Sequence, residues 1–175
     1  NSTCLDECGV VNGDNSTCLD ECGVVNGDNS TCSDECGVVN GDGINECGNC
    51  DEWVFVFGEC YEIATTFLID LNYMGIDSLP INFGYLTNLK YLFLANNSIS
   101  SLPNSFGNLT NLEQLYLNNN QLTSIPENIA NLINLTELTL NNNQLTSIPE
   151  SLGTLTNLTE LTLNNNQLTS IPESL

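Results

Sequence analysis

The sequence predicts an α/β-type solenoid dominated by a parallel β-sheet, with little regular helix. Two observations support this fold class: the chain repeats every 23 residues from Thr66 onward, and leucines recur at the same positions in each unit. A period of 20–30 residues is typical of stacked units that bury their apolar faces against one another. A third observation, a separate 14-residue repeat rich in Cys, Asp and Asn over residues 1–42, predicts a second region.

The two periods divide the chain into three expected parts. We expect disulfide-rich acidic repeats over residues 1–46, an N-terminal cap of the solenoid over 47–65, and the solenoid itself over 66–175. The solenoid should hold five repeats, the last of them incomplete. The small first part should be a disulfide-rich array that is irregular in structure.

The charge balance excludes several classes of partner. The chain has 22 acidic residues, one basic residue and no His, giving a net charge of −21. Such a chain repels nucleic acid and anionic lipid, and attracts cations such as Ca²⁺. No apolar run approaches the roughly 20 residues of a membrane span. Because the sequence has no signal peptide and does not begin with Met, we interpret it as a processed chain or an excised piece.

Each 23-residue unit begins with the pattern L-x-x-L-x-L-x-x-N and continues to a Ser-Leu-Pro or Ser-Ile-Pro. The clear copies of the first pattern span residues 89–97, 112–120, 135–143 and 158–166, and a fainter copy contains Thr66, Ile69, Leu71 and Met74. The prolines are Pro80, Pro103, Pro126, Pro149 and Pro172. This pattern resembles the leucine-rich repeat family over about two thirds of the chain. The resemblance implies that function lies at the variable positions of the strand face.

The same pattern has a direct physical interpretation. Alternate leucines point inward from a short strand, and strands of successive units pair in parallel about 4.8 Å apart. The Asn at the ninth position can satisfy backbone groups where the chain turns inward. We therefore expect an internal ladder, broken by Met74 in the first repeat, of Asn97, Asn120, Asn143 and Asn166. Each proline fits an irregular outer limb where no strand amide is needed.

The variable strand positions give a candidate binding surface. Tyr91, Phe93 and Tyr116 should cluster outward on adjacent strands, which suggests a contact site for a protein or a sugar. Alternatively, these aromatics seal against the N-terminal segment or only pack across the strands.

Glu137 and Glu160 should lie on neighbouring strands like paired carboxylates. We favour a solvated acidic ladder and predict no enzyme, because no nucleophile–base constellation or cofactor fingerprint appears.

Nine Cys residues in a short chain indicate an oxidising compartment and a disulfide framework, and therefore an extracellular protein. The 14-residue units resemble the acidic C-G-V-C-x-G-D segments of some secreted proteins. Here Val11, Val25 and Val39 stand where those segments usually have a further Cys. Zinc is the alternative explanation, but the array lacks the paired short spacings of a four-ligand site.

Tight-turn signals suggest a pairing of these cysteines. A hairpin about Asn12-Gly13 would bring Cys8 near Cys18, and Asn-Gly recurs in the next two units. The predicted pairs are Cys8–Cys18, Cys22–Cys32, Cys36–Cys47 and Cys50–Cys60, with Cys4 left for an upstream copy of the unit. The alternative is local pairing such as Cys4–Cys8, which makes very small rings and leaves Cys60 odd.

The same units space oxygen ligands in a way that resembles calcium loops. The candidate ligands are Asn12, Asp14, Ser16, Asp20 and Glu21 in one unit, and Asn26, Asp28, Ser30, Asp34 and Glu35 in the next. The units lack the central Gly and bidentate Glu of an EF-hand. Asx-rich turns on a solvated surface are the alternative. No cofactor is required by the sequence, and calcium is the one that it suggests.

Asn-x-Ser/Thr sequons predict covalent N-glycans as partners of a secreted chain. They occur at Asn1, Asn15, Asn29, Asn96, Asn108, Asn134 and Asn157. Because most of them recur with the repeats, the sugars would form rows along one side.

The last feature is near-identity between repeats. The segment 158–175 copies 135–152 without change and then stops in mid-repeat. A bare solenoid end exposes a sheet edge, and end-to-end contacts that do not close produce filaments. We therefore predict a secreted, glycosylated structural protein of a fibril, surface layer or extracellular matrix that assembles with itself. The alternative is an extracellular recognition or adhesion module that binds a protein or glycan on the strand face.

Overall fold

A computed structural model describes residues 44–45, 48–49 and 52–175. The chain divides into two compact units, Asn1–Cys50 and Asp51–Leu175. In the first unit, the described part is an antiparallel pair of β1 (Ile44–Asn45) and β2 (Gly48–Asn49). The predicted calcium loops, the predicted disulfides among Cys4 to Cys47 and the sequons at Asn1, Asn15 and Asn29 lie outside the described residues.

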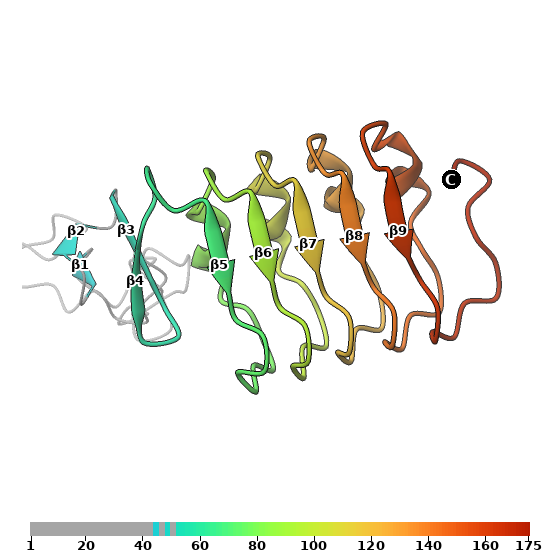
Figure 1. The fold of residues 1–175 in the computed structure, drawn as a ribbon, viewed down its shortest axis with the longest axis horizontal. Helices are drawn as coiled ribbons and strands as arrows, with labels where there is room; N and C mark the ends of the chain where they lie inside the picture. The colour runs from blue at the N-terminus through green and yellow to red at the C-terminus, as the bar shows by residue number, and fades with distance from the viewer. Residues whose placement is uncertain (1–43, 46–47, 50–51) are drawn as a thin grey trace, which may run out of the picture. The chain divides into compact units, whose positions relative to one another are not determined.

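The second unit is built on a five-stranded parallel sheet whose strands follow one another in sequence order (Figure 1). The strands are β5 (Leu68–Asp70), β6 (Tyr91–Phe93), β7 (Gln114–Tyr116), β8 (Glu137–Thr139) and β9 (Glu160–Thr162). Their register aligns one central side chain from each repeat, namely Ile69, Leu92, Leu115, Leu138 and Leu161. The predicted parallel solenoid is thereby confirmed.

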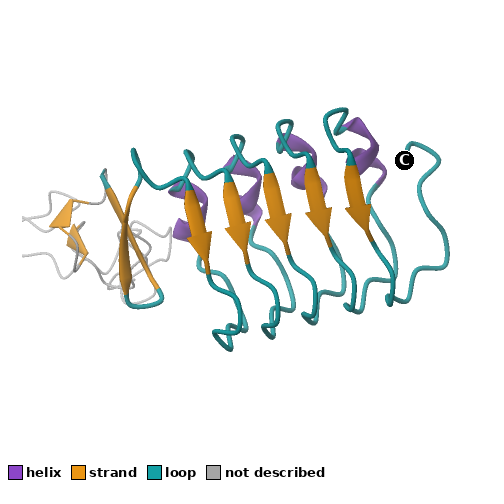
Figure 2. Ribbon diagram, in the orientation of Figure 1, coloured by secondary structure: helices purple, strands orange, loops and turns teal. Residues whose placement is uncertain are grey.

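A short 3-10 helix forms the outer limb of four repeats and lies behind the sheet in Figure 2. These helices are η1 (Ile81–Tyr85), η2 (Asn104–Asn108), η3 (Glu127–Asn131) and η4 (Glu150–Thr154). A proline precedes each one with φ between −66° and −71°. Proline suits this position because its fixed φ matches the helix start and its missing N–H would have no partner there. The predicted outer limb with little regular helix is confirmed.

One continuous hydrophobic core fills the space between the sheet and the outer limb. Leu92, Leu115 and Leu138 are completely buried, and Phe83 and Phe106 meet them from the helical side. Burying a side chain of this size stabilises the fold by about 1.5–3 kcal/mol, so the fixed spacing of the leucines provides most of the driving force for stacking.

An antiparallel hairpin precedes the first repeat and covers its core. It consists of β3 (Trp53–Val56) and β4 (Glu59–Glu62), joined through Phe57 and Gly58, both with positive φ. Val54 and Val56 are 2% exposed and belong to the same core as the leucines. The Asn82 side chain of η1 donates to the Phe55 carbonyl at 3.3 Å. The hairpin therefore occupies the place where the sequence predicts a cap.

The predicted asparagine ladder is present and links each repeat to the one before it. The Asn120 amide donates to the carbonyls of Leu94 and Leu117 at 2.9 and 3.1 Å, and its oxygen accepts the Ile99 N–H at 3.0 Å. The equivalent bonds recur at Asn97, Asn143 and Asn166. One side chain thus satisfies backbone groups of two neighbouring repeats.

The residue before each ladder asparagine takes a left-handed conformation, and so does Tyr73 before Met74 at the equivalent position of the first repeat. Their φ angles lie between 56° and 60° at Tyr73, Asn96, Asn119, Asn142 and Asn165. Asparagine adopts this region more readily than other non-glycine residues, which explains the Asn-Asn pairs of the later repeats. Met74 breaks the ladder in the first repeat, as predicted, but its backbone N–H still donates to the Asn97 oxygen at 3.1 Å.

We expect Asn120→Ala to lower the free energy of unfolding by about 2–4 kcal/mol, because three buried backbone groups lose their partner. Asn119→Gly is the matched control. It replaces the adjacent asparagine, whose positive φ suits glycine, and should change stability by less than about 0.5 kcal/mol. Urea unfolding followed by circular dichroism measures both. Equal stability of the two variants would contradict the proposed role of the ladder.

Candidate functional site

The outward side chains of β5–β9 form two rows across the sheet, which we call the strand face. The central residue of each three-residue strand points into the core, so its two neighbours point outward. The first row is Leu68, Tyr91, Gln114, Glu137 and Glu160, and the second is Asp70, Phe93, Tyr116, Thr139 and Thr162. All the strand-face residues singled out from the sequence lie in these rows.

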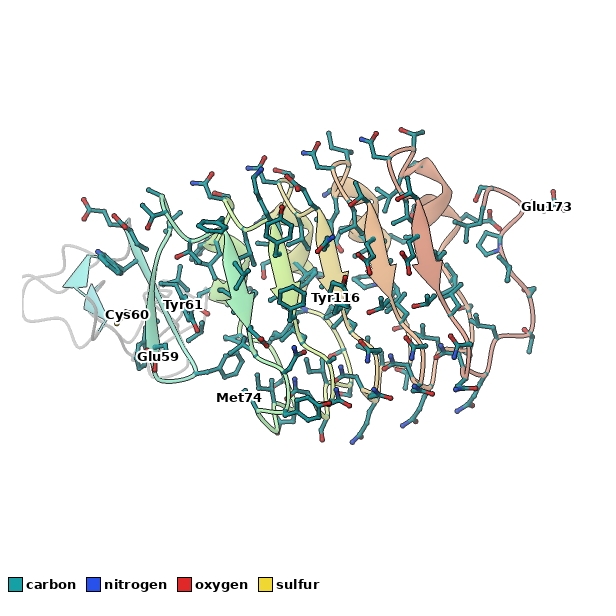
Figure 3. The ribbon with its side chains drawn as sticks, viewed as in Figure 1. Glu59, Cys60, Tyr61, Met74, Tyr116 and Glu173 are labelled. Atoms are coloured by element: carbon teal, nitrogen blue, oxygen red, sulfur yellow. The ribbon has the colours of Figure 1, made fainter. Side chains whose placement is uncertain are left out.

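Two of the predicted aromatic residues pack against each other across β6 and β7. Phe93 and Tyr116 are partners in register, and their ring centroids lie 4.9 Å apart with an interplanar angle of 40°. Such tilted contacts are favourable for aromatic rings. We call these two residues the aromatic pair. Both side chains remain partly exposed, and Figure 3 labels Tyr116 on the sheet. Cross-strand packing therefore occurs without removing the rings from solvent.

Tyr91, the third predicted aromatic, is engaged with its neighbours. Its hydroxyl donates to Glu113 Oε2 at 3.2 Å, and Lys90 Nζ lies 2.8 Å from Glu113 Oε1. The hydrogen bond from Lys90 holds the pKa of Glu113 below its ordinary value. Lys90 is the one basic residue of the chain. Its charge is thus matched by the Glu113 carboxylate beside it, and the carboxylates of the strand face lack a Lys or Arg partner.

Carboxylates flank the aromatic pair on both sides. Asp70 is the register partner of Phe93 on β5, and its carboxylate accepts the Asn72 N–H at 3.0 Å. On the other side, β8 carries Glu137, whose register partners are Gln114 on β7 and Glu160 on β9. Burial, followed by the neighbouring Glu137 carboxylate and the charge of Glu160, raises the pKa of Tyr116 to about 12. The Tyr116 phenol therefore stays protonated to a higher pH than an ordinary tyrosine.

The strand face becomes polar toward β9. The hydroxyl of Thr139 donates to Asn118 at 3.2 Å, and that of Thr162 donates to Asn141 at 3.3 Å. These side chains satisfy one another within the sheet. Within the part of the chain that the structure describes, no group of three or more His, Cys, Asp or Glu side chains is arranged to hold a metal ion.

A second asparagine row was not recognised in the sequence. These asparagines sit just before the first leucine of each pattern, and their amides donate to backbone carbonyls of the preceding unit: Asn88, Asn111, Asn134 and Asn157. The signal for it was the Leu-Thr-Asn-Leu motif, which recurs every 23 residues with Ile133 in place of Thr in one copy. Two of the predicted sequons, at Asn134 and Asn157, thus coincide with a structural hydrogen bond.

The other two sequons of the repeats are in different surroundings. Asn108 is exposed at the end of η2, and its amide makes no hydrogen bond with another described residue. Asn96 is partly buried and has a φ of 58°. Among the seven predicted sites, Asn108 is therefore the one that the described residues present to solvent with an unengaged amide.

Cys60 of the cap hairpin is disulfide-bonded. Its partner is not among the described side chains, so the predicted Cys50–Cys60 pair stays a prediction. Among the described residues, none of the helices has the length and apolar character that spanning a membrane requires.

Parallel strands, proline-led 3-10 turns and a buried asparagine ladder define a repeat solenoid with an open strand face. A family model described as a leucine-rich repeat region matches residues 68–175, which is more than half of the chain. The chain belongs to the leucine-rich repeat family. Domains of this family are typically protein-binding modules and are generally not catalytic. No curated protein matches the chain.

Several solved structures resemble this chain. A leucine-rich repeat protein of Leptospira interrogans is 33% identical with a TM-score of 0.51, over 64% of this chain and 34% of that one. A TDR receptor is 46% identical with a TM-score of 0.53, over 55% and 18%. The leucine-rich repeat domain of APL1B is 32% identical with a TM-score of 0.56, over 59% and 33%. The matched region thus spans about a third or less of each of these structures.

The raised pKa of Tyr116 predicts a pH dependence of stability. Between the ordinary value of 10.0 and about 12, the folded state holds a proton that the unfolded state has lost. This contribution to stability is complete below pH 10 and disappears as the pH rises through about 12. Urea unfolding at each pH measures this effect. Between pH 10 and about 12, we expect the free energy of unfolding to fall less in Tyr116→Phe than in the wild type. Tyr85→Phe, which removes an exposed tyrosine of η1, is the control and should follow the wild type.

Proposed function

We propose that this leucine-rich repeat domain is an extracellular recognition module that binds a protein partner through the aromatic pair. The observation that carries the proposal is the contact of Phe93 and Tyr116 on the strand face, where both rings remain partly exposed. Among the repeats with clear motifs, β8 and β9 carry threonine at this position. The aromatic pair is thus a local departure from a repeated surface.

The chemistry of the pair suits protein recognition. Large aromatic side chains are enriched at the energetic centres of protein interfaces, because they bury much apolar area at a small cost in conformational entropy. The contact between the rings restrains both of them before a partner arrives, which further reduces this cost. The polar side chains beyond β7 that remain accessible, such as Thr162, would form the rim of such an interface.

The similarity to solved leucine-rich repeat structures adds support. One of those proteins is a receptor, and 55% of this chain matches part of it at 46% identity. Because the matched region covers 18% of that receptor, a receptor-like role of the present chain is part of the proposal.

The second candidate function is structural self-assembly. One observation favours it: a hollow of about 330 Å³ beside β9 is lined in part by Leu155, Leu158 and Leu161. Leu161 is only partly buried, whereas the equivalent Leu138 is fully buried. A further repeat stacked there, from a continuation of the chain or from another copy, would continue the sheet and cover these leucines.

We further propose that the chain is secreted and that Asn108 carries an N-glycan in preference to Asn134 and Asn157. Attachment at Asn134 or Asn157 adds a bulky group to an amide nitrogen that already lies 2.8 or 2.7 Å from a backbone carbonyl. Asn108 has no such contact among the described residues. The proposal extends the secretion expected from the nine cysteines.

Glycopeptide mapping of the chain secreted from eukaryotic cells tests this order of preference. We expect glycan at Asn108 and lower occupancy at Asn134 and Asn157. Glycan on both of those sites with a bare Asn108 would contradict the order, and an intact mass equal to that of the unmodified polypeptide would reject glycosylation altogether.

The recognition proposal predicts that Phe93→Thr/Tyr116→Thr abolishes partner binding without unfolding the domain. Threonine is the residue that β8 and β9 already carry at this position, so the fold should accept it. Ile81→Ser/Ile133→Ser is the control, because it removes two exposed apolar side chains that lie off the strand face. A panel of purified extracellular proteins is screened by surface plasmon resonance.

The expected result is a partner that binds the wild type and the control, but binds the threonine variant at least about tenfold more weakly. Sedimentation velocity on the same samples should show dispersed monomers. If the wild type binds no protein in the panel and instead sediments as growing assemblies, the structural function is favoured and the recognition proposal fails.

A further inference from the structure

We propose that the partner presents an arginine-bearing segment, whose guanidinium group stacks on the aromatic pair between the carboxylates of the strand face. This inference rests on the proposed recognition function and specifies its ligand. The residues that carry it are the aromatic pair together with Asp70, Glu137 and Glu160, which we call the acidic–aromatic patch.

The charge of the chain makes a cationic partner the complementary one. The net charge is −21, and the single basic residue, Lys90, is already paired with Glu113 at 2.8 Å. No other Lys or Arg exists to neutralise Asp70, Glu137 or Glu160 from within the chain. An approaching basic segment is therefore attracted over a distance set by the ionic strength, and it relieves repulsion among these carboxylates on contact.

The geometry of the patch selects a guanidinium group over a simple point charge. A planar cation can lie over an aromatic ring while its edge donates to carboxylates, which arginine does better than lysine. The rings of Phe93 and Tyr116 offer the surface, with Asp70 in register on one side. On the other side, β8 and β9 carry Glu137 and Glu160 in register, and both carboxylates can accept charge-assisted hydrogen bonds.

The test uses a labelled 12-residue peptide of glycine and serine with three arginines, and a matched peptide with citrulline in place of arginine. Citrulline keeps the shape of the side chain but removes its charge. Binding to the full chain is measured by fluorescence anisotropy at about 0.15 M salt, where long-range attraction is screened. Thermal unfolding of every variant confirms that it is folded.

Two double variants with equal charge separate the patch from the general acidity of the chain. Glu137→Gln/Glu160→Gln removes two carboxylates of the patch, whereas Glu59→Gln/Glu173→Gln removes two exposed ones that lie off the strand face, as Figure 3 shows. We expect the first to weaken arginine-peptide binding at least about fivefold and the second less than about twofold. Phe93→Thr/Tyr116→Thr should match the first, and the citrulline peptide should not bind.

Equal weakening by the two glutamine variants would overturn the inference, because binding would then report only net charge. Binding of the citrulline peptide as tight as that of the arginine peptide would overturn it as well. If neither peptide binds while a protein from the panel still depends on Phe93 and Tyr116, recognition stands and the arginine inference fails. If the panel yields no partner, recognition fails whatever the peptides do.

Discussion

The buried amide at the ninth position of each repeat is the interaction on which the rest of this structure depends. Where the chain leaves the sheet and turns into the core, backbone groups are buried without strand partners, and an unsatisfied group there is costly. Asn120 meets three of these groups at once, one in its own repeat and two in the repeat before. The leucines supply the free energy of stacking, and the asparagines make the turn that allows stacking to continue.

The fold was predictable because a solenoid is specified by local repetition. The period, the inward leucines and the proline of the outer limb each determine a local geometry, and parallel strands in register follow from stacking that geometry. The left-handed residue before each ladder asparagine could also have been inferred from the Asn-Asn pairs. This left-handed position was missed because the first repeat has Tyr73 and Met74 in place of the two asparagines, so the Asn-Asn pattern is absent there.

The candidate site was predictable only in part. The repeat pattern placed Tyr91, Phe93 and Tyr116 on one face, because strand periodicity determines direction. It could not show that Phe93 and Tyr116 contact each other while Tyr91 turns to Glu113, because rotamers depend on neighbouring side chains. The hydrogen bonds that the Asn134 and Asn157 side-chain amides donate were missed for another reason. The same residues form a sequon, so the pattern was interpreted as a glycosylation signal alone.

The side-chain hydrogen bonds between neighbouring repeats also determine how the domain unfolds. Each ladder asparagine reaches only the preceding repeat, and the strands likewise pair only with their immediate neighbours. Cooperativity in such an array passes from one repeat to the next, with no contact that joins distant repeats directly. Unfolding should therefore start at the outermost repeats and spread inward. The boundary between folded and unfolded repeats can then lie at several positions along the chain.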